Sequence, residues 1–313
     1  MESHAQARGV LTLAYGHTRF IEQARYLGYS LRLHAPRVSC SLVTDSKDPS
    51  LSAVFDKIIP LRSEYGSGVR QKLYLDHYSP YRETLFIDSD CLVLSNLDGL
   101  WAAFSGQYFG VPGFRYVRKG YVDPYMDLDF VLDQLNLIAL PKFNGGTYYF
   151  TDSAESRAFF ETARGILNDW RKLRLAPFRK NGPADEAIYA VAMAIHRTEM
   201  TYFPAGGMWT PCGYKGKLIL DGLRGFCSFE KDGELRTPEI VHFPGEYIYC
   251  FAYTREKMKI RKAVDGLGTP AIPLARAYFF SLLWRLTRVS PGLSRLGRSS
   301  VRAYRAAARA LNV

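Results

Sequence analysis

The sequence has few of the features that mark membrane-spanning or disulfide-bonded chains. It contains no run of eighteen apolar residues, so no membrane-spanning helix is expected. The opening residues, MESHAQARGV, lack the apolar core of a signal peptide. The five cysteines form no CxxC pair, and their odd number argues against a disulfide framework. These absences predict a cytoplasmic protein with reduced thiols.

Acidic residues are missing from the C-terminal end. Residues 271–313 contain eight arginines but no acid and no lysine, and they supply +8 of the net charge of +11. The nearly neutral remainder argues against a nucleic-acid-binding surface, and no nucleic-acid partner is expected. The segment GLGTPAIP, residues 266–273, breaks any helix. We therefore divide the chain into a main domain, 1–265, and a basic amphipathic helical tail, 271–313.

The tail carries its arginines at helical spacing. Five of them are spaced 3, 4, 3 and 4 residues apart, so on a helix they form one stripe (Arg295, Arg298, Arg302, Arg305 and Arg309). A basic, aromatic and amphipathic helix is typical of peripheral contact with an anionic membrane, and we prefer this interpretation. Two alternatives stay open: the apolar face packs on the main domain, or the arginines bind nucleic acid.

Short apolar segments alternate with helical ones along the first 250 residues. The predicted strands are 10–14, 39–44, 57–61, 84–87, 145–151 and 239–242, and the predicted helices are 20–33, 69–77, 154–173 and 185–196. This alternation predicts an α/β fold with a mainly parallel sheet. Such sheets bind ligands beyond the carboxyl ends of their strands, where Asp45, Asp88 and Asp90 are expected to lie.

Two aspartates interrupt the apolar run LFIDSDCLVL, residues 85–94. In an extended segment the side chains of Asp88 and Asp90 would point the same way, about 6.6 Å apart. Buried carboxylates need a partner, and oxygen ligands favour Mg²⁺ or Mn²⁺. The segment therefore predicts a divalent-metal site, with a pair of acids that caps a strand end as the alternative. A second D-x-D, Asp127 and Asp129, follows no apolar strand, and we interpret it as a chance occurrence on a loop or helix start.

The run LFIDSDCLVL resembles the D-x-D segment of GT-A glycosyltransferases, especially glycosyltransferase family 8. The resemblance spans residues 10–250 and implies a GT-A fold with a Rossmann-like mixed sheet. It also implies a hexosyltransferase that moves a sugar from a nucleotide-sugar, UDP-linked, to an acceptor hydroxyl. The resemblance favours retention of configuration, and with inversion Asp185 or Glu186 would be the general base. The basic tail suggests a glycan or glycolipid as the acceptor. Mn²⁺ (or Mg²⁺) would lie between Asp88, Asp90 and the diphosphate.

The resemblance extends to a late histidine. His242 in IVHFPG matches the histidine that completes the family's metal site, and Gly245 falls at the matching glycine. The family usually has a lysine three residues later, where this chain has Ile248. We therefore expect the cation that neutralises the diphosphate elsewhere, at Lys257 or Lys259.

The remaining candidate residues match shorter family segments. The resemblance implies Asp185, Glu186 and Asn144 as catalytic residues, and Ala14, Tyr15, Asp45, Arg70, Lys72, Ser89 and Gly145 as donor-binding residues. An amide offers two donors and an acceptor, which suits sugar hydroxyls, and charge-assisted bonds from Arg70 or Lys72 suit phosphate. Each segment also has a plain structural interpretation, such as an Asn-Gly turn or acids in a first helical turn.

Two rival functions remain open from the sequence. A phosphatase of the haloacid dehalogenase type also places D-x-D after an apolar strand, but its metal site needs a further paired-aspartate element that we do not find. A carbohydrate- or nucleotide-binding protein without turnover would keep the same binding residues. Replacement of Asp88 separates a catalyst from an inert binder, because only the catalyst has turnover to lose.

Overall fold

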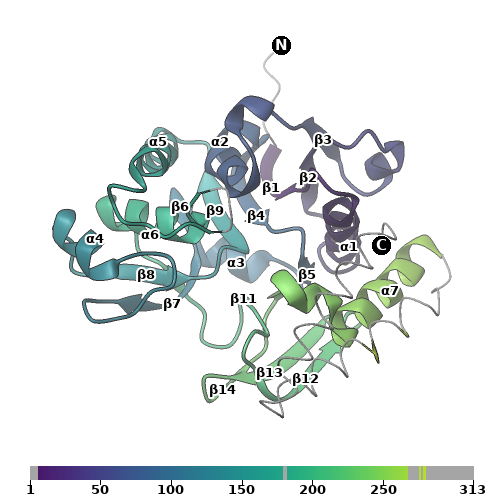
Figure 1. Cartoon of the computed structure of the whole chain (residues 1–313). Coiled ribbons are helices and arrows are strands. Elements are labelled where there is room, and N and C mark those ends of the chain that lie inside the picture. The colour runs from purple at the N-terminus through teal and green to yellow at the C-terminus, as the bar shows by residue number, and fades with distance from the viewer. Residues whose placement is uncertain (1–5, 179–181, 267–274, 276–277, 280–313) are drawn as a thin grey trace.

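The computed structural model describes residues 6–178, 182–266, 275 and 278–279 of the 313-residue chain (Figure 1). Its α-helices are α1 (Thr18–His34), α2 (Leu75–Tyr78), α3 (Asp98–Ala103), α4 (Leu128–Gln134), α5 (Ala154–Asp169), α6 (Asp185–Ile195) and α7 (Phe251–Asp265). Four 3₁₀ helices complete the helical part: η1 (Pro49–Ala53), η2 (Ser63–Tyr65), η3 (Gly68–Tyr74) and η4 (Gly245–Tyr249).

A six-stranded sheet forms the centre of the molecule, in the order β3-β2-β1-β4-β9-β6. Its strands are β1 (Gln6–Leu13), β2 (Ser39–Thr44), β3 (Lys57–Pro60), β4 (Tyr81–Ile87), β6 (Phe109–Gly110) and β9 (Thr147–Thr151). Only β9 runs against the others, because its pairings with β4 and β6 are antiparallel while β3, β2, β1 and β4 pair in parallel. The predicted α/β fold with a mixed, mainly parallel sheet is confirmed.

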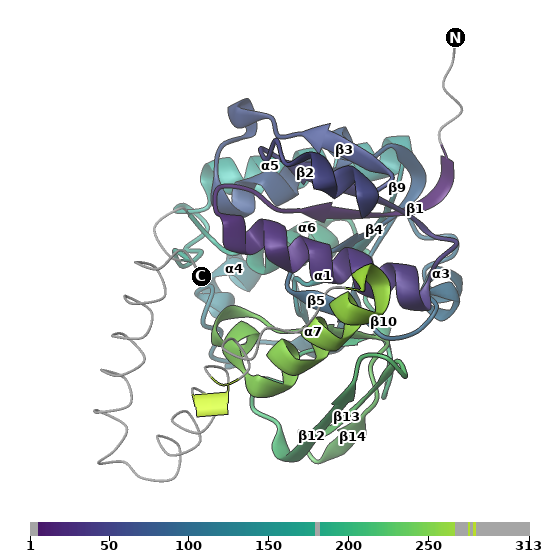
Figure 2. The same ribbon diagram turned by 90° about the vertical axis from the view of Figure 1, so that its right-hand side faces the viewer.

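Both faces of this sheet are buried, which explains the continuous apolar runs in its strands. Alternate residues face opposite ways. Val10 and Leu85 belong to the core that α1 covers, whereas Leu11 and Phe86 belong to the core that α5 and α6 cover. Helix α7 packs against α1 on the first side (Figure 2). The sheet is thus the middle layer between two helical layers.

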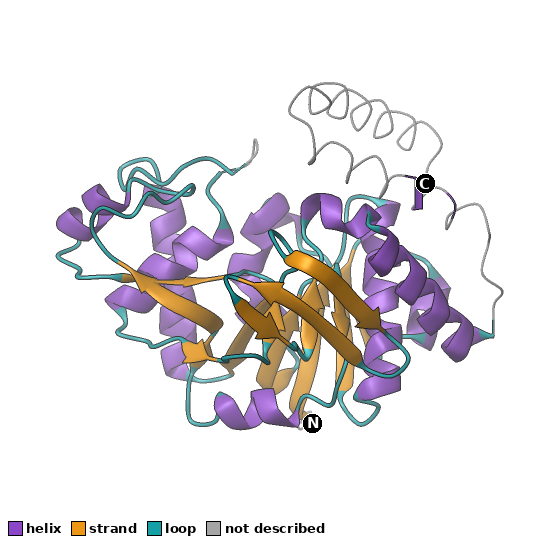
Figure 3. Ribbon diagram, turned by 90° about the horizontal axis from the view of Figure 1, so that it is seen from below, coloured by secondary structure: helices purple, strands orange, loops and turns teal. Residues whose placement is uncertain are grey.

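Three small sheets flank the central one (Figure 3). Their strands are β5 (Cys91–Val93), β7 (Pro112–Val117), β8 (Leu140–Phe143), β10 (Thr201–Tyr202), β11 (Met208–Trp209), β12 (Lys215–Asp221), β13 (Phe226–Lys231), β14 (Glu234–Arg236) and β15 (Ile240–His242). They pair in the orders β10-β7-β8, β11-β15-β5 and β12-β13-β14. The sheet β11-β15-β5 positions the candidate site, because it pairs β5, which follows Asp88 and Asp90, with β15, which contains His242.

One local prediction needs correction, and one is confirmed. A single helix was expected over residues 69–77, but the chain forms η3 followed by the single turn α2, which begins at Leu75. The amide Nε2 of Gln71 donates to the carbonyls of Arg62 and Gly66, each at 2.8 Å, and ties η3 to the preceding loop. The second D-x-D starts a helix, as expected: the side chain of Asp127 caps α4 by accepting from the amide N of Phe130.

The predicted domain edge lies at the end of α7. That helix ends at Asp265, and Gly266 follows with φ +68°, a left-handed conformation that glycine adopts without strain. Apart from residues 275, 278 and 279, the predicted tail 271–313 lies outside the described residues. In the part of the chain that is described, no helix combines the length and the apolar character needed to cross a bilayer.

Candidate active site

The two aspartates of LFIDSDCLVL lie in a turn between β4 and β5. The amide N of Asp88 donates to the carbonyl of Gly146 at 2.9 Å, and the amide N of Cys91 donates to the carbonyl of Asp88 at 3.1 Å. The segment was expected to be extended, but strand β4 ends at Ile87 and residues 89 and 90 form a turn. The turn, rather than the two-residue period of a strand, determines where the two carboxylates point.

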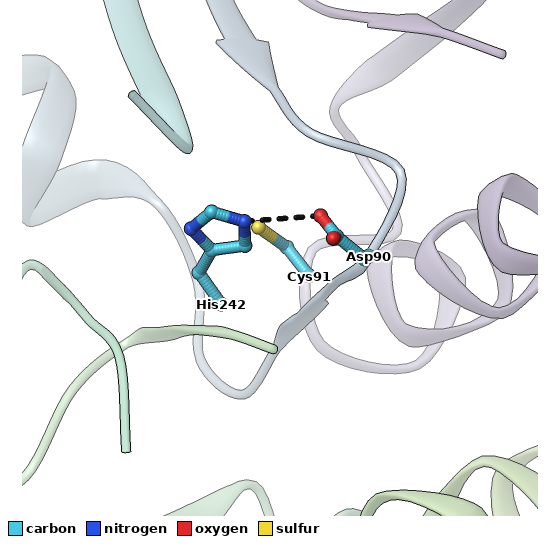
Figure 4. A group of neighbouring side chains, drawn as sticks. All are labelled: Asp90, Cys91 and His242. Carbon is cyan, nitrogen blue, oxygen red and sulfur yellow. Dashed lines mark ion pairs between the residues drawn. The ribbon is translucent and has the colours of Figure 1, made fainter. Parts of the chain in front are cut away.

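His242 lies opposite this turn because of strand pairing. Strand β15 pairs antiparallel with β5, and the register places His242 beside Cys91. The Nε2 atom of His242 lies 3.1 Å from Oδ1 of Asp90 (Figure 4). It lies 3.9 Å from Oδ2 of Asp88. The three residues predicted as metal ligands therefore converge, although 152 positions separate Asp90 from His242 in the sequence.

Asn144 orients this imidazole. Its side-chain oxygen Oδ1 lies 2.5 Å from Nδ1 of His242 and also accepts from the amide N of Gly146 at 3.1 Å. Because the amide oxygen of Asn144 accepts from Nδ1, Nε2 is the ring nitrogen that faces the two carboxylates. A hydrogen bond of this kind is what fixes the tautomer of metal-binding histidines.

The two glycines after Asn144 are required by close contacts. A Cβ atom on Gly146 would lie 2.6 Å from Nδ1 of His242. On Gly145 it would lie 2.5 Å from the hydroxyl of Tyr148 and 3.0 Å from Oδ2 of Asp185. Any side chain at these positions would push the imidazole or the Asp185 carboxylate out of place.

Lys72 joins the metal-site carboxylates to those of α6. Its Nζ lies 2.8 Å from Oδ2 of Asp88 and 3.0 Å from Oδ2 of Asp185, and it donates to the carbonyl of Gly145 at 3.2 Å. The backbone carbonyl of Lys72 accepts from the hydroxyl of Tyr189 at 2.6 Å, which anchors η3 on α6. The lysine therefore lies at the centre of the candidate site.

The charged side chains around Lys72 include more acids than cations, and this excess of negative charge shifts their pKa values. Burial raises the pKa of Asp88, and Lys72 only partly opposes the rise. Burial also opposes the charged form of Lys72, but Asp185 and Asp88 outweigh it and raise the pKa of the ammonium. Likewise, Asp90 and Asp88 outweigh burial and raise the pKa of His242. The network thus favours additional positive charge.

Glu186 has a different environment from its neighbour. The Oδ2 atom of Asp185 accepts from Lys72 and from the hydroxyl of Tyr148 at 2.7 Å, so this oxygen is already engaged. Glu186 accepts only the amide N of Gly145, at 2.7 Å, among the contacts seen in the described residues. Burial, followed by the charge of Asp185, raises the pKa of Glu186 to about 7. Of the two acids, Glu186 is the one poised to exchange a proton near neutral pH.

The residues predicted to hold the nucleotide lie at the carboxyl ends of β1 and β2. Asp45 accepts from the amide N of Gly16 at 3.1 Å and 3.3 Å, which closes the loop after Ala14. The hydroxyl of Tyr15 donates to the carbonyl of Gly68 at 2.9 Å and so links this loop to η3, which carries Lys72. These residues are thus tied to the element that carries Lys72.

Two predicted donor-binding residues stand apart from the network. Ser89 is buried within the turn between the aspartates, with 8% of its surface exposed. Arg70 is exposed and borders a separate cavity, which it shares with Gly66, Trp170 and Arg171. The structure therefore places Lys72, but not Arg70, among the carboxylates.

A cation that the sequence analysis missed lies near the segment after His242. Arg19, in the first turn of α1, donates from Nη1 to the hydroxyl of Tyr249 in η4 at 3.0 Å. Its Nε is buried and has no hydrogen-bond partner in the described part of the chain. The positive end of the helix dipole disfavours arginine in a first turn unless an anion is close. An arginine at the start of a helical segment was therefore the signal in the sequence that could have identified Arg19.

The two lysines proposed for the diphosphate are engaged on α7. Lys259 pairs with Glu256 at 3.0 Å, and Lys257 lies over the rings of Tyr26 and Tyr253. Ile248, which stands where the family usually has a lysine, is buried in η4. Of these three cations, Arg19 is the one in contact with η4, the element that follows His242.

The donor set fits a hard dication. Asp88 and Asp90 offer carboxylate oxygens and His242 offers the unprotonated Nε2, which together suit Mn²⁺ or Mg²⁺. The side-chain ligand atoms of Asp90, Cys91 and His242 lie within 4.8 Å of one another. The Cys91 thiol is completely buried, and burial raises its pKa well above the usual range, so it stays a neutral thiol rather than a thiolate ligand.

Solved structures of glycosyltransferases have a similar architecture. One is the galactosyltransferase LgtC in complex with donor and acceptor sugar analogues. It superposes with a TM-score of 0.53 at 11% identity, over 85% of this chain and 99% of that one. An active-site mutant of LgtC gives 0.54 at 11% identity, over 86% and 99%. This chain has the GT-A fold.

A third structure, the bifunctional glycosyltransferase WbbM, gives a TM-score of 0.54 at 12% identity. It covers 89% of this chain but 52% of WbbM. No protein-family model matches the sequence, and no curated protein sequence matches it. The GT-A fold therefore rests on architecture, while the chemistry must be argued from the site itself.

Proposed function

We propose that this chain is a metal-dependent glycosyltransferase that moves a sugar from a nucleotide-sugar, UDP-linked, to an acceptor hydroxyl with retention. The observation that carries the proposal is the convergence of Asp88, Asp90 and His242 at the carboxyl end of β4, with Lys72 and Asp185 beside them. In open α/β sheets this edge is where ligands bind. The GT-A fold favours the transferase over the phosphatase alternative.

The metal site would be formed by Asp88, Asp90 and His242, with Asn144 holding the imidazole. A bound Mn²⁺ or Mg²⁺ supplies a Lewis acid that neutralises the charge of a departing diphosphate. The excess of carboxylates over cations in the network supports a dication there. Lys72 holds Asp88 and Asp185 at a fixed separation, so both carboxylates keep their orientation before any ligand arrives.

We assign the nucleoside to the loop after β1, with Ala14, Tyr15 and Asp45, and the diphosphate to Arg19. The guanidinium lies between that loop and η4, which directly follows the metal-site strand. Charge-assisted hydrogen bonds from arginine to phosphate oxygens are among the strongest polar contacts. Arg19 would replace the lysine that this chain lacks at Ile248.

We assign the binding of the sugar and the uptake of the acceptor proton to the residues around α6. Asn144, Lys72 and Asp185 offer donors and acceptors for sugar hydroxyls on one side of the site. With retention, the leaving phosphate helps deprotonate the acceptor hydroxyl. Glu186, whose pKa lies at about 7, is the side chain able to take up that proton afterwards.

The test uses the two D-x-D motifs as matched variants. Wild-type protein should release UDP slowly from at least one UDP-sugar in the presence of Mn²⁺, and EDTA should stop the release. Asp88→Ala and Asp90→Ala should lower the rate at least a hundredfold. Asp127→Ala and Asp129→Ala should keep it within about twofold, because these residues cap and support α4. Equal activity in all four variants would falsify the metal assignment.

The organisation of the chain extends the proposal. We assign catalysis to residues 1–265 and contact with anionic membrane to 271–313, with a glycan or glycolipid as acceptor at the cytoplasmic face. The eight arginines of that tail and its lack of acids support this placement. Liposome co-sedimentation of the full chain and of a chain ending at residue 270 tests it.

A further inference from the structure

A cavity of about 240 Å³ opens beside the candidate active site and has no role so far. Asn144 and Glu186 form one wall and belong to the network described above. The rest of the lining includes six aromatic residues: Phe114, Tyr121, Tyr125, Phe143, Phe203 and Trp209. Small-molecule sites combine an apolar lining with a few placed polar groups in this way.

Trp209 is the best supported of these aromatic residues. It lies in β11, next to β15, and the pairing brings it alongside Val241 and therefore close to His242. The guanidinium carbon of the buried Arg236 lies 4.0 Å from the centre of the Trp209 ring. Arg236 does not line the cavity, so it supports the indole from behind and fixes its orientation. The ring of Phe114 lies 6.2 Å away at an interplanar angle of 32°.

The charges around the cavity favour a neutral ligand. Its two lysines are already engaged: Lys142 pairs with Asp123 at 2.6 Å, and Lys231 donates to the carbonyl and hydroxyl of Thr210, both at 3.0 Å. Burial also lowers the pKa of Lys231. Two acids, Glu186 and Asp232, complete the lining. No cation of the lining is left unengaged to attract an anionic group.

We propose that this cavity binds the acceptor as a neutral saccharide, with one pyranose ring stacked on Trp209 and a hydroxyl directed toward Glu186. The inference rests on the proposed function and names the acceptor class. One face of a pyranose presents several C–H groups and is apolar, which suits an aromatic surface. The ring edges carry hydroxyls, for which Asp232 and Glu186 offer acceptors and the side-chain NH₂ of Asn144 offers a donor. A cavity of this volume suits one sugar ring better than a whole nucleotide-sugar.

The experiment measures binding and catalysis separately. The probes are methyl pyranosides of glucose, galactose, mannose and xylose, added to the full-length protein with UDP and Mn²⁺. Saturation-transfer NMR reports binding of each glycoside, and UDP release from UDP-sugars is measured with and without it. The variants are Trp209→Ala, Trp209→Phe and Phe114→Ala. Phe226→Ala, an exposed aromatic residue on β13, is the control.

We expect at least one glycoside to bind and to accelerate UDP release. Trp209→Ala should raise the KM for the glycoside about tenfold or more, and circular dichroism together with the melting temperature in the presence of UDP and Mn²⁺ checks that the variant is folded. Trp209→Phe should keep part of the affinity, Phe114→Ala should lose part of it, and Phe226→Ala should match wild type.

Three results would overturn the inference. Wild-type protein binds no glycoside, or Trp209→Ala and Phe114→Ala both keep the wild-type KM, or they raise the KM for the UDP-sugar instead. The last result would assign the cavity to the donor sugar. Failure of the proposed function looks different: glycosides bind and Trp209→Ala weakens them, but no UDP-sugar is cleaved by any form of the protein.

Discussion

The side-chain oxygen of Asn144 lies 2.5 Å from Nδ1 of His242, and this contact decides which nitrogen of the imidazole faces Asp88 and Asp90. A residue predicted to touch sugar thus also acts on the metal site. The same oxygen accepts from Gly146, so the amide cannot rotate without loss of a second bond. Metal affinity should depend on Asn144 even when no nucleotide-sugar is present.

Asn144→Ala should weaken Mn²⁺ binding about tenfold to a hundredfold, because loss of a hydrogen bond to a ligating histidine has effects of that size. Calorimetric titration of the protein with Mn²⁺ alone measures it. Asn96→Ala, which removes an exposed amide before α3, is the control and should leave Mn²⁺ affinity unchanged. Wild-type affinity in Asn144→Ala would show that the imidazole is oriented by other contacts.

Lys72 competes with a cation for Asp88. Lys72→Met should lower the free energy of unfolding by about 3–5 kcal/mol, because it leaves two buried carboxylates without their partner. Urea denaturation measures the change. Mn²⁺ should then raise the melting temperature of Lys72→Met more than that of wild type, since the dication no longer has to displace an ammonium from Asp88. An equal rise in both proteins would contradict this competition.

The sequence could predict those parts of the site whose signals are local. Asp88 and Asp90 stand out because polar residues interrupt an apolar run, and His242 and Asn144 stand beside glycines in short segments. The sheet was predictable because strands buried on both faces are continuous apolar runs. The turn after β4 was not, since the apolar run continues through residues 91–94 and does not show that β4 stops at Ile87 and a separate strand, β5, begins at Cys91.

The missed residues depend on contacts between distant segments. Arg19 meets Tyr249, and Trp209 meets Arg236, through packing that no local pattern encodes. Lys72 and Arg70 were predicted together as donor-binding residues, and only the docking of η3 on α6 separates the two. Local chemistry thus gives the candidate residues, while tertiary packing decides which of them act together.

Glu186 should make stability depend on pH. Its pKa is about 7 in the folded chain against an ordinary 4.5, since burial and Asp185 outweigh Lys142, Lys72 and the amide of Gly145. The folded state therefore holds its proton more tightly, and stability present below about pH 4.5 is lost as pH rises through 7. Glu186→Gln removes this loss. Its free energy of unfolding should exceed that of wild type by about 1–3 kcal/mol at pH 8, with a much smaller difference at pH 5. Equal differences at both pH values would contradict the raised pKa.

Deletion of residues 271–313 should abolish binding to vesicles that contain phosphatidylserine, because it removes eight arginines and no acid. Co-sedimentation at low and at physiological salt measures it, and binding of the full chain should fall as salt rises. Vesicles of phosphatidylcholine alone are the control. Undiminished binding by the shortened chain would show that the membrane contact, if present, lies within residues 1–270.

Arg19 should matter for the diphosphate and not for the base. Arg19→Gln is expected to weaken UDP about tenfold to a hundredfold, the size of one or two charge-assisted hydrogen bonds, and to leave uridine binding unchanged. Calorimetry with both ligands in the presence of Mn²⁺ measures the contrast. Lys259→Gln and Lys257→Gln serve as comparisons on α7, since one pairs with Glu256 and the other lies over aromatic rings. If a lysine variant weakens UDP while Arg19→Gln does not, the diphosphate is held from α7 and the guanidinium only joins α1 to η4.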